Sequence, residues 1–389
     1  MTAPRPRVAV LFPSFRGGGA ESVCLWMVEA LRQDHQVTLH TFSDIRLGPL
    51  NQYHGTAIPD GEVEVLHPFA ATLLNRAADG SRGLFTLRQH LVIRHFKRCR
   101  PPADLAISAY NEMDLGRPGI QYIHYPLFGA GHEAARAEVG APDSAARAAY
   151  RRFCRGLSRF SDRGMKANLT IANSRWTADV VKRVYGIDAR VIYPPVADDM
   201  PVVPWERRQD GIVVLGRLVP EKRVEKAIRI VQALRSRGLD LRLCILGGGA
   251  DPAYLASLRR LLDGNESWAT MRIGLARREM AALVAGYRFG LHVRENEQFG
   301  IAVAEMVKAG CIPFVPSTGG QREIVGDSEE LLFDDESQAV ERIAGVVSRP
   351  QVQHRLRRSL ESRGRMFSAS RFVAEIREAA REMTARAGG

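Results

Sequence analysis

The sequence predicts an α/β protein built from two doubly wound domains, each a parallel sheet with helices on both faces. Apolar runs of strand length alternate with helix-patterned segments along the whole chain, and many of these runs end in glycine-rich loops. The chain has 389 residues, which is too long for one ordinary domain and suits two of about 150 to 200 residues each. Hydrophobic residues make up 45% and charged residues 25% of the chain, enough for two cores in a globular protein.

The composition also argues against several other classes of protein. No apolar run reaches the roughly 18 residues that a membrane-spanning helix needs. The first residues lead into a glycine-rich loop rather than a cleavage site, so we expect no signal peptide. The five cysteines are scattered and include no C-x-x-C pair, which argues against a disulfide framework or a zinc site and favours a reducing cytosol.

Residues 7–13 (RVAVLFP) are predicted to form the first strand, and Gly17, Gly18 and Gly19 follow it closely. A helical stripe then leads to a second strand at residues 36–42, so the chain opens with a βαβ unit. The glycine loop does not match G-x-G-x-x-G, which makes a dinucleotide site a weak interpretation. Two interpretations remain: a plain tight turn, or a loop whose backbone N–H groups meet phosphate or sugar oxygens.

The net charge of +12 is concentrated in the second half of the first domain. Between Arg76 and Arg183, 19 lysines and arginines face 9 acidic residues, and many of them lie in residues 84–100, which are patterned as an amphipathic helix, and in a second basic segment, residues 145–166. These segments are either solvated helix faces or a surface that docks on anionic lipid head groups. Few aromatic residues are interleaved and no nucleic-acid-binding module is recognisable, so we expect no nucleic acid partner.

Residues 119–126 (GIQYIHYP) are predicted to form a strand that runs out into a loop carrying His124 and Tyr125. A single histidine at a strand end is either a structural residue or a group presented to a ligand, and the pattern alone leaves both open. A further strand is predicted at residues 169–172, followed by a capped helix. A proline-rich connection at residues 196–204 then marks the hinge between the domains.

The second domain repeats the same alternation of strands and helices. Its first strand ends in Gly216 and Arg217, and Lys222 follows five residues later, just before a helix. An arginine and a lysine at such a turn can clamp a diphosphate and neutralise the charge of a leaving phosphate; the alternative is an ordinary charged surface. A later strand at residues 271–275 contains Gly274 and ends at the same edge of the predicted sheet.

The most informative stretch of the second domain is residues 290–325. Glu297 precedes a helix-patterned run at residues 299–309, Glu305 lies within that run, and Gly300 allows close approach of a ligand to the backbone. The first N–H groups of the helix carry a partial positive charge that suits an anionic ligand. Taken singly, the two glutamates are equally consistent with ordinary helix-start and helix-surface carboxylates.

Taken together, these motifs resemble the family GT4 retaining glycosyltransferases of the GT-B fold. The two glutamates are eight residues apart and match the E-x7-E signature of that family. The resemblance covers nearly the whole chain, through GGGAE, IHYP, NSRWT, YPPV, GRLVPEK, ILGGG, LHVRENEQFGIAVAEM and STGGQREIV. Within the family, the chain is most similar to the mannosyltransferases that extend the lipid-linked oligosaccharide and to their bacterial relatives, although its GGQ sequence, ending at Gln321, departs from their Gly-Gly-Pro pattern.

The resemblance implies that two Rossmann-like domains face each other across a cleft. The first, residues 1–196, would bind the acceptor and would be completed by a C-terminal helix at residues 370–389 that crosses back to it. The second, residues 205–369, would bind the nucleotide-sugar donor. Closure of the two domains about the linker would expel water and protect the donor from hydrolysis.

The resemblance also implies roles for individual residues. Arg217 and Lys222 would bind the donor diphosphate, and Glu305 the ribose hydroxyls. Glu297 would bind the sugar hydroxyls, and His124 would contact the sugar near its reacting carbon. These four side chains, His124, Glu297, Arg217 and Lys222, are the expected catalytic set. The other donor-binding residues would be Gly18, Gly19, Gly216, Gly274, Gln298, Phe299, Gly300, Ile301 and Glu305. The acceptor side would comprise Gly17, Glu21, His124 and Tyr125.

The implied activity is transfer of a sugar, with retention, from a nucleotide diphosphate sugar to a hydroxyl of a glycan or lipid-linked acceptor. GDP-mannose is the favoured donor and a UDP-sugar the next. We expect no metal or other cofactor, because no Asp-x-Asp sequence lies at a strand end and the basic pair can replace a metal. The expected location is cytoplasmic, with peripheral attachment to the inner face of the cytoplasmic membrane left open. Two alternatives remain: a sugar-nucleotide epimerase of the same fold, and a catalytically silent partner protein.

Overall fold

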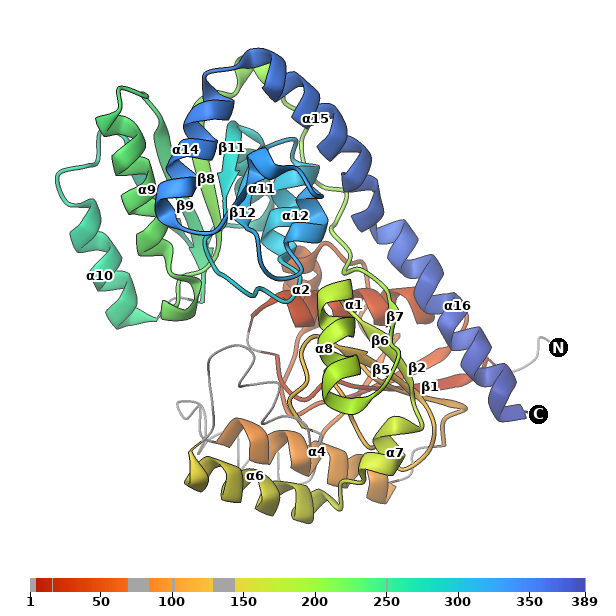
Figure 1. Cartoon of the computed structure of the whole chain (residues 1–389). Helices are drawn as coiled ribbons and strands as arrows, with labels where there is room; N and C mark the ends of the chain where they lie inside the picture. The colour runs from red at the N-terminus through yellow and green to blue at the C-terminus, as the bar shows by residue number, and fades with distance from the viewer. Residues whose placement is uncertain are drawn as a thin grey trace. The chain divides into compact units, whose positions relative to one another are not determined.

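The computed structural model of the chain describes residues 5–15, 17–68, 84–99, 102–128, 144–249 and 251–388. The chain divides into two compact units, whose elements are labelled in Figure 1. Unit 1 comprises Met1–Tyr193 together with Ser370–Gly389, and unit 2 comprises Pro194–Ala369. Each unit has a parallel sheet of its own.

The described part of unit 1 contains a seven-stranded sheet with the order β3-β2-β1-β4-β5-β6-β7, and all of its pairings are parallel. The order reverses between β1 and β4, so this unit has the switch point at which doubly wound sheets bind ligands. The strands are β1 (Arg7–Leu11), β2 (Gln36–His40), β3 (Glu64–Leu66), β4 (Leu105–Ser108), β5 (Ile120–Ile123), β6 (Leu169–Ala172) and β7 (Arg190–Val191). The helices are α1 (Gly19–Leu31), α2 (Leu47–His54), α4 (Phe85–Cys99), α6 (Ala145–Ser158), α7 (Asp162–Lys166), α8 (Arg175–Tyr185) and α16 (Ala369–Gly388).

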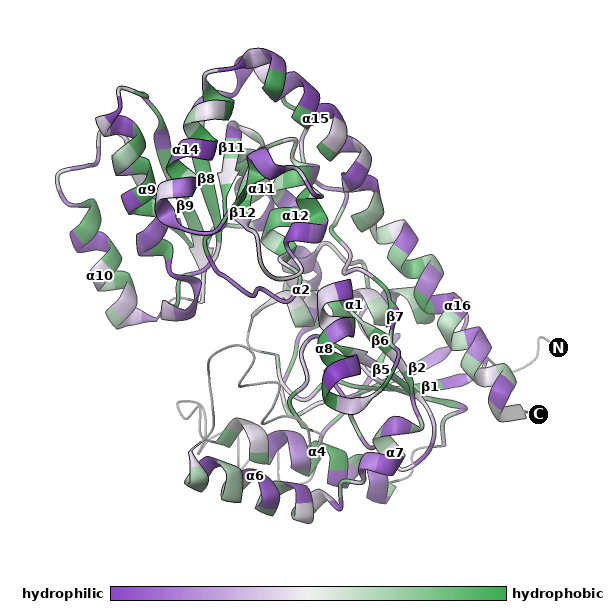
Figure 2. Ribbon diagram, in the orientation of Figure 1, coloured by the Kyte–Doolittle hydropathy of each residue, from purple (hydrophilic) through white to green (hydrophobic). Residues whose placement is uncertain are grey.

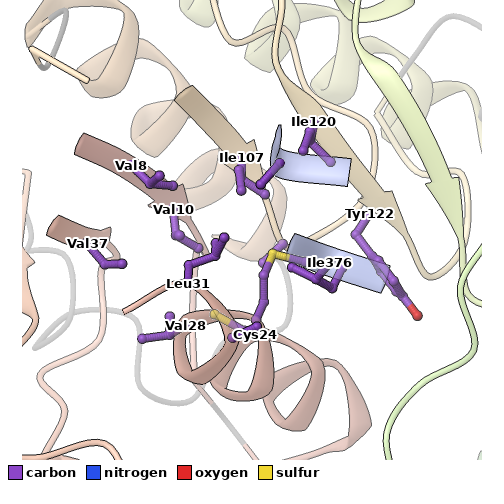
Figure 3. Packing of buried hydrophobic residues seen from close by; sticks show 14 of the residues in the cluster. Val8, Val10, Cys24, Val28, Leu31, Val37, Ile107, Ile120, Tyr122 and Ile376 are labelled. Carbon is purple, nitrogen blue, oxygen red and sulfur yellow. The ribbon is translucent and has the colours of Figure 1, made fainter. Parts of the chain in front are cut away.

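Both faces of the unit 1 sheet are covered by apolar side chains. Val8 and Val10 of β1 pack on one face and Ala9 and Leu11 on the other, as the alternation of side chains along a strand requires. Helix α4 covers the second face. Helices α1 and α16 cover the first, where Ile376 of α16 lies among residues of the sheet and of α1 (Figure 3). The buried residues that α16 contributes are Phe372, Ile376, Ala379, Ala380 and Met383.

The described part of unit 2 contains a six-stranded parallel sheet with the order β10-β9-β8-β11-β12-β13. Its order reverses between β8 and β11, which again creates a switch point. The strands are β8 (Gln209–Arg217), β9 (Arg242–Gly248), β10 (Ala269–Ile273), β11 (Tyr287–Leu291), β12 (Ile312–Pro316) and β13 (Leu332–Phe333). The helices are α9 (Val224–Ser236), α10 (Pro252–Leu262), α11 (Arg277–Ala285), α12 (Ile301–Lys308), α13 (Arg322–Val325), α14 (Glu336–Val347) and α15 (Pro350–Gly364). Short 3-10 helices are η2 (Trp205–Arg207), η3 (Pro220–Lys222), η4 (Glu329–Leu331) and η5 (Arg365–Phe367).

The central strands of unit 2 are hydrophobic along most of their length, whereas its helices carry hydrophilic residues on their outer sides (Figure 2). Strands β9 and β12 are examples, since every residue in the middle of each is buried. A parallel strand covered on both faces needs such a continuous apolar run. The polar residues of this unit that could bind a ligand are therefore found in the loops that follow the strands.

The basic segment at residues 145–166 forms two helices. Arg159 ends α6 because its φ of 50° is left-handed and cannot continue the helix. The hydroxyl of Ser161 then accepts a hydrogen bond from the N–H of Gly164 at 3.2 Å and caps α7. The chain therefore turns in the middle of the segment.

Helix α4 lies where the sequence predicts the other basic helix, at residues 84–100. Its basic last turn contains Lys97 and Arg98, while Arg100 lies outside the described residues. Among the helices that the structure describes, none combines the length and the apolar character needed to cross a membrane.

Candidate active site

Three basic side chains surround the carboxylate of Glu297 in unit 2. Glu297 lies in the loop between β11 and α12 and is 8% exposed. Its Oε2 is 2.5 Å from the Nζ of Lys222, the last residue of η3. The same oxygen is 3.3 Å from a guanidinium nitrogen of Arg294 and 3.4 Å from the Nε2 of His292. The loops after β8 and β11 thus meet at one carboxylate.

This environment keeps Glu297 ionised. Burial by itself would raise the pKa of the carboxyl, but the charge of Lys222, together with the nearby His292 and Arg294, holds this pKa well below its usual value. Burial also lowers the pKa of His292, and the charges of Lys222 and Arg294 lower it further against the attraction of Glu297. The site therefore presents an anionic, buried hydrogen-bond acceptor beside fixed positive charges at neutral pH.

The Glu297 loop is held against a glycine-containing loop that follows β12. The N–H of Gly320 donates to the carbonyl oxygen of Glu297 at 2.8 Å, and the N–H of Asn296 donates to the hydroxyl of Thr318 at 3.2 Å. A Cβ added at Gly319 would lie 2.6 Å from the Glu297 carbonyl oxygen, so only glycine permits this approach. The two adjacent glycines of the sequence thus bring the two loops together.

Helix α12 begins directly after this loop. Gly300 precedes its first residue, Ile301, and adopts a φ of 99° that few other residues tolerate. The neighbouring Phe299 is 2% exposed, and its ring packs edge-on against that of Phe367 with centroids 5.5 Å apart. Because the first N–H groups of a helix have no acceptor inside it, the start of α12 at Ile301 offers backbone donors to ligand oxygens.

Glu305 of α12 forms an ion pair with Arg277, the first residue of α11. Arg277 also donates to both oxygens of Asp199, at 2.8 and 2.9 Å. Burial alone would lower the arginine pKa, but the two carboxylates raise it above the usual value, so the guanidinium stays charged. In turn, Arg277 lowers the pKa of Asp199 against the effect of burial. Arg277 therefore links Glu305 to the segment that precedes β8.

Arg217 and Lys222 lie close together in the chain but have different surroundings. Arg217 ends β8, is exposed, and makes no ion pair within the described part of the chain. Lys222 is half-buried and paired, as given above. Gly216 has a φ of 153°, and an added Cβ there would meet no atom within 4 Å among the residues that the structure describes. Gly274 follows β10 with a φ of 68° and is exposed.

In unit 1, His124 and Tyr125 follow β5 in a loop that one side chain fixes. The Oδ1 of Asn111 accepts from the N–H of His124 at 2.8 Å and from that of Tyr125 at 3.0 Å. The Nε2 of His124 lies 3.2 Å from the carbonyl oxygen of Ala109. Burial lowers the pKa of His124 to about 4, although the bond to Ala109 opposes the shift. The ring is thus neutral at pH 7, with its proton on Nε2 and Nδ1 as an acceptor.

A buried carboxylate supports the same loop from the other side. Glu112 is fully buried, and its Oε1 accepts hydrogen bonds from the N–H of Leu127 and from the hydroxyl of Tyr185, both at 2.6 Å. Asn111 has a φ of 62°, a left-handed conformation in which asparagine is enriched. The short Asn111-Glu112 sequence therefore shapes the loop that carries His124.

The glycine loop after β1 leads into α1. Gly17 and Gly18 have φ values of 83° and 158°, and an added Cβ at either would meet no atom of a described residue within 4 Å. Gly19 is the first residue of α1, and Glu21 lies in its first turn. Glu21 is 5% exposed, and its Oε2 lies 3.8 Å from the Nε2 of His54 in α2. Glu21 thus contacts a second helix, whereas no described residue crowds the two glycines.

Several residues of these clusters are absent from the set predicted from the sequence. His292 and Arg294 lie within a turn of Glu297 and could have been found by examining every ionisable residue of that loop. Arg277 is 28 residues from Glu305 in the chain, and no local pattern connects it to Glu305 or Asp199. The sequence around Asn111 does not reveal its role in the His124 loop either, because that role depends on how a neighbouring strand folds.

Two family models match the chain, one after the other. Residues 17–199 match the model of Glycosyltransferase Family 4, and residues 197–364 match the model of Glycosyl transferases group 1. The matches cover both units and include all the loops described above.

Two named relatives are mannosyltransferases. The chain is 26% identical over 191 residues to the GDP-Man:Man(3)GlcNAc(2)-PP-Dol alpha-1,2-mannosyltransferase of Dictyostelium discoideum, which covers 44% of this chain and 38% of that one. It is 31% identical over 166 residues to the GDP-mannose-dependent alpha-(1-6)-phosphatidylinositol dimannoside mannosyltransferase of Mycobacterium tuberculosis, which covers 42% of each chain. The match thus spans less than half the length of either relative.

Among solved structures, the fold is similar to that of the Anabaena protein HepE in complex with UDP-glucose. The TM-score is 0.69 at 16% identity, and the alignment covers 97% of this chain and all of the other. The family models, the relatives and the two parallel-sheet units agree with one another. The chain belongs to the family 4 glycosyltransferases of the GT-B fold.

Proposed function

We propose that this chain transfers a sugar from a nucleotide diphosphate sugar to a hydroxyl group of a glycan or lipid-linked acceptor, with retention of configuration at the reacting carbon. The observation that carries the proposal is the ionised Glu297 held against Lys222 at the switch point of unit 2. GDP-mannose is the favoured donor, because the names of both mannosyltransferase relatives specify it. A UDP-sugar is the second choice, since HepE was solved with UDP-glucose.

The donor diphosphate would be bound by Arg217 and Lys222. Arg217 makes no ion pair with described residues and can turn to a phosphate without breaking a contact. Among the described residues, Lys222 pairs with the Oε2 of Glu297 alone, and its remaining N–H groups can donate to the diphosphate. The three basic contacts of Glu297 all involve Oε2, so Oε1 is available to sugar hydroxyls. One cluster would thus bind both halves of the donor.

The same cations would assist the reaction itself. The bond between the anomeric carbon and the phosphate oxygen breaks, the acceptor oxygen bonds to that carbon on the same face, and the acceptor proton passes to the leaving phosphate. Negative charge grows on the phosphate in this step, so fixed positive charges stabilise the transition state more than the ground state. We assign this task to Arg217 and Lys222 without a metal, and we assign to His124 a hydrogen bond from a sugar hydroxyl to Nδ1.

A second part of the proposal concerns the acceptor. Helix α6 exposes an aromatic ring between basic side chains: Phe153 is 63% exposed, and Arg147 and Arg152 of the same helix are exposed as well. A basic helix with an exposed aromatic residue suits the interface of an anionic membrane. We therefore propose that unit 1 attaches peripherally to anionic lipid on the cytoplasmic side, where a lipid-linked acceptor would be presented.

Vesicle sedimentation tests the membrane part. Binding to anionic vesicles at low salt should weaken in high salt, because the attraction is electrostatic, and Phe153→Ser should weaken it further. Tyr53→Ser is a matched control, since Tyr53 is 53% exposed on α2, and α2 packs on the sheet face opposite to that covered by α4. Equal binding to neutral and anionic vesicles, or none to either, would remove this part of the proposal.

Thermal unfolding with a panel of nucleotide sugars tests the donor. GDP-mannose, UDP-glucose and ADP-glucose differ in base, and a ligand at 100 times its dissociation constant adds about 2.7 kcal/mol to stability. A shift with one base identifies the donor class, and a transfer assay follows with that donor. Conversion of the donor without any acceptor would show an epimerase instead, and no shift in a folded sample would favour a silent partner protein.

A further inference from the structure

A buried glutamine joins the two loops that form the candidate sugar site. Gln321 is fully buried and directly precedes α13. Its Nε2 donates to the carbonyl oxygen of Arg294 at 2.9 Å and to that of Thr318 at 3.0 Å. Arg294 belongs to the loop after β11, and Thr318 to the loop after β12. One amide group therefore bridges both loops.

Gln321 also supports the chain on the far side of Glu297. A Cβ added at Gly300 would lie 3.3 Å from the Cβ of Gln321, so the start of α12 packs directly on this residue. Arg294 precedes Glu297 by three residues and Gly300 follows it by three. The backbone on both sides of the carboxylate thus rests on the same side chain.

Packing alone does not explain a glutamine here. Its Oε1 is buried and accepts no hydrogen bond within the described part of the chain, and a buried unsatisfied oxygen is unfavourable. Methionine has nearly the same length and flexibility, and it would fill the space without this oxygen. Methionine cannot, however, donate to the two carbonyl groups. The bridge between the loops is what the amide adds.

We propose that Gln321 is a positioning residue for Glu297, which holds the carboxylate where it receives the hydroxyls of the donor sugar. This inference rests on the proposed function. Gln321 does not touch the donor but acts through the loop that carries Glu297. Its removal should therefore weaken the contacts to the sugar half of the donor. The affinity for the nucleotide half, which the turn after β8 and Glu305 would bind, should stay almost unchanged.

The chain offers a closely matched control in Gln353. This glutamine of α15 is also buried, at 7% exposure, and its Nε2 also donates to two backbone carbonyl groups, those of Val346 at 3.1 Å and Val347 at 2.9 Å. Both residues lie in unit 2, but the bonds of Gln353 join α14 to α15 rather than two site loops. Gln353→Met thus removes an equivalent pair of hydrogen bonds without touching the Glu297 loop.

The experiment compares the binding of GDP-mannose and of GDP to wild type, Gln321→Met and Gln353→Met by titration calorimetry. UDP-glucose and UDP replace this pair if the wild type prefers uridine. For Gln321→Met we expect affinity for the nucleotide sugar to fall about tenfold and affinity for the bare nucleotide to change less than twofold, with a matching rise in KM in the transfer assay. For Gln353→Met we expect both affinities to match wild type.

A second variant, Gln321→Glu, keeps the shape but turns a carboxylate toward two carbonyl oxygens. Its affinity for the nucleotide sugar should recover as the pH falls from 8 to 6, because only the protonated form can donate. Unchanged sugar-nucleotide affinity in Gln321→Met, or equal losses for nucleotide and nucleotide sugar, would overturn the inference while leaving the proposed function intact. A wild-type protein that binds neither nucleotide sugar would overturn both, and loss of folding in both Gln321 variants would show a role in the fold alone.

Discussion

The Nζ of Lys222 lies 2.5 Å from the Oε2 of Glu297, although the two residues are 75 positions apart in the chain. The contact joins the cation proposed for the donor diphosphate to the carboxylate proposed for the donor sugar. Each charge therefore sets the environment of the other, and a substitution at either residue changes the electrostatic surroundings of its partner. A buried charge that loses its partner is costly, so the pair is expected to act as a unit.

Lys222→Ala should lower turnover about 100-fold or more, because it removes positive charge from the position where the leaving phosphate becomes more negative. It should also raise the pKa of Glu297, since Lys222 is the main group that opposes the effect of burial. Initial rates of sugar transfer test the first expectation. Lys226→Ala is the control, because Lys226 pairs with the exposed Glu295 at 2.9 Å and should leave turnover within about twofold of wild type. Near-wild-type rates for Lys222→Ala would refute the assignment of Lys222 to the diphosphate site.

Glu305→Ala should also lower turnover about 100-fold or more, through loss of the proposed ribose contact. In contrast to a change at Gln321, this substitution should weaken bare nucleotide and nucleotide sugar equally, because both contain the ribose. Glu305→Gln keeps an oxygen acceptor and should lose less. Calorimetric titration of the three proteins with nucleotide decides the point: if Glu305→Ala binds nucleotide as tightly as wild type, Glu305 does not contact the ribose.

Arg277→Leu should destabilise unit 2 by about 3 kcal/mol, because it leaves the Glu305 and Asp199 carboxylates without their common partner. The side chains of Arg277 and Glu305 are each only 13% exposed, so water replaces the lost contact poorly. Arg237→Leu removes an arginine whose pair with Glu341 is exposed, and it should cost less than about 1 kcal/mol. Urea unfolding of both variants provides the comparison, and equal midpoints would refute the prediction.

His40 should make unit 1 sensitive to acid. Burial lowers the pKa of His40 to about 4 in the folded chain, from 6.5 for an unperturbed histidine, with a smaller contribution from His95. The folded state therefore binds this proton less readily than the unfolded state. The resulting stability is fully present above pH 6.5 and is lost as pH falls toward 4, by about 3 kcal/mol in total.

His40→Leu should reduce this dependence between pH 4 and 6.5, while the share that comes from His124, whose pKa burial also lowers to about 4, remains. Stability at pH 8 should be equal or greater, because both ring nitrogens of His40 lack hydrogen-bond partners in the described chain. Thermal unfolding over this pH range measures the effect. His67→Gln, at an exposed histidine of the same unit, should follow the wild-type profile. A wild-type profile for His40→Leu would show that His40 does not limit acid stability.

Much of the fold could be predicted from local sequence. The strand predicted at residues 169–172 is β6 with the same limits, and the serine of its capped helix, Ser174, accepts from the N–H of Thr177 at 3.0 Å as an N-cap should. Such elements follow from apolar runs and turn residues next to them in the chain. The left-handed conformation of Arg159 could not be predicted, because nothing in the sequence distinguishes a left-handed arginine from a helical one.

In the candidate site, too, local motifs could be predicted from the sequence, whereas contacts between distant residues could not. Glu297 and Lys222 could be selected from motifs, since each lies in a recognisable loop. Their contact could not, because it depends on the pairing of β8 with β11, which no local pattern specifies. Arg277 and Asp199 were missed for the same reason, and Gln321 was noted only as a departure from the family pattern: all three act through neighbours that the fold, not the sequence order, brings to them.

The helix α16 has a consequence for synthesis of the chain. Unit 2 is continuous, whereas the core of unit 1 includes residues from α16 such as Phe372 and Ile376. As the ribosome extends the chain, α1 can cover its share of this apolar sheet face early, but the share that α16 covers stays exposed until unit 2 has already emerged. Unit 2 can therefore fold first, and the nascent first unit is exposed to aggregation until the last helix arrives. A stop codon shortly before residue 370 would thus disable the domain that was made first.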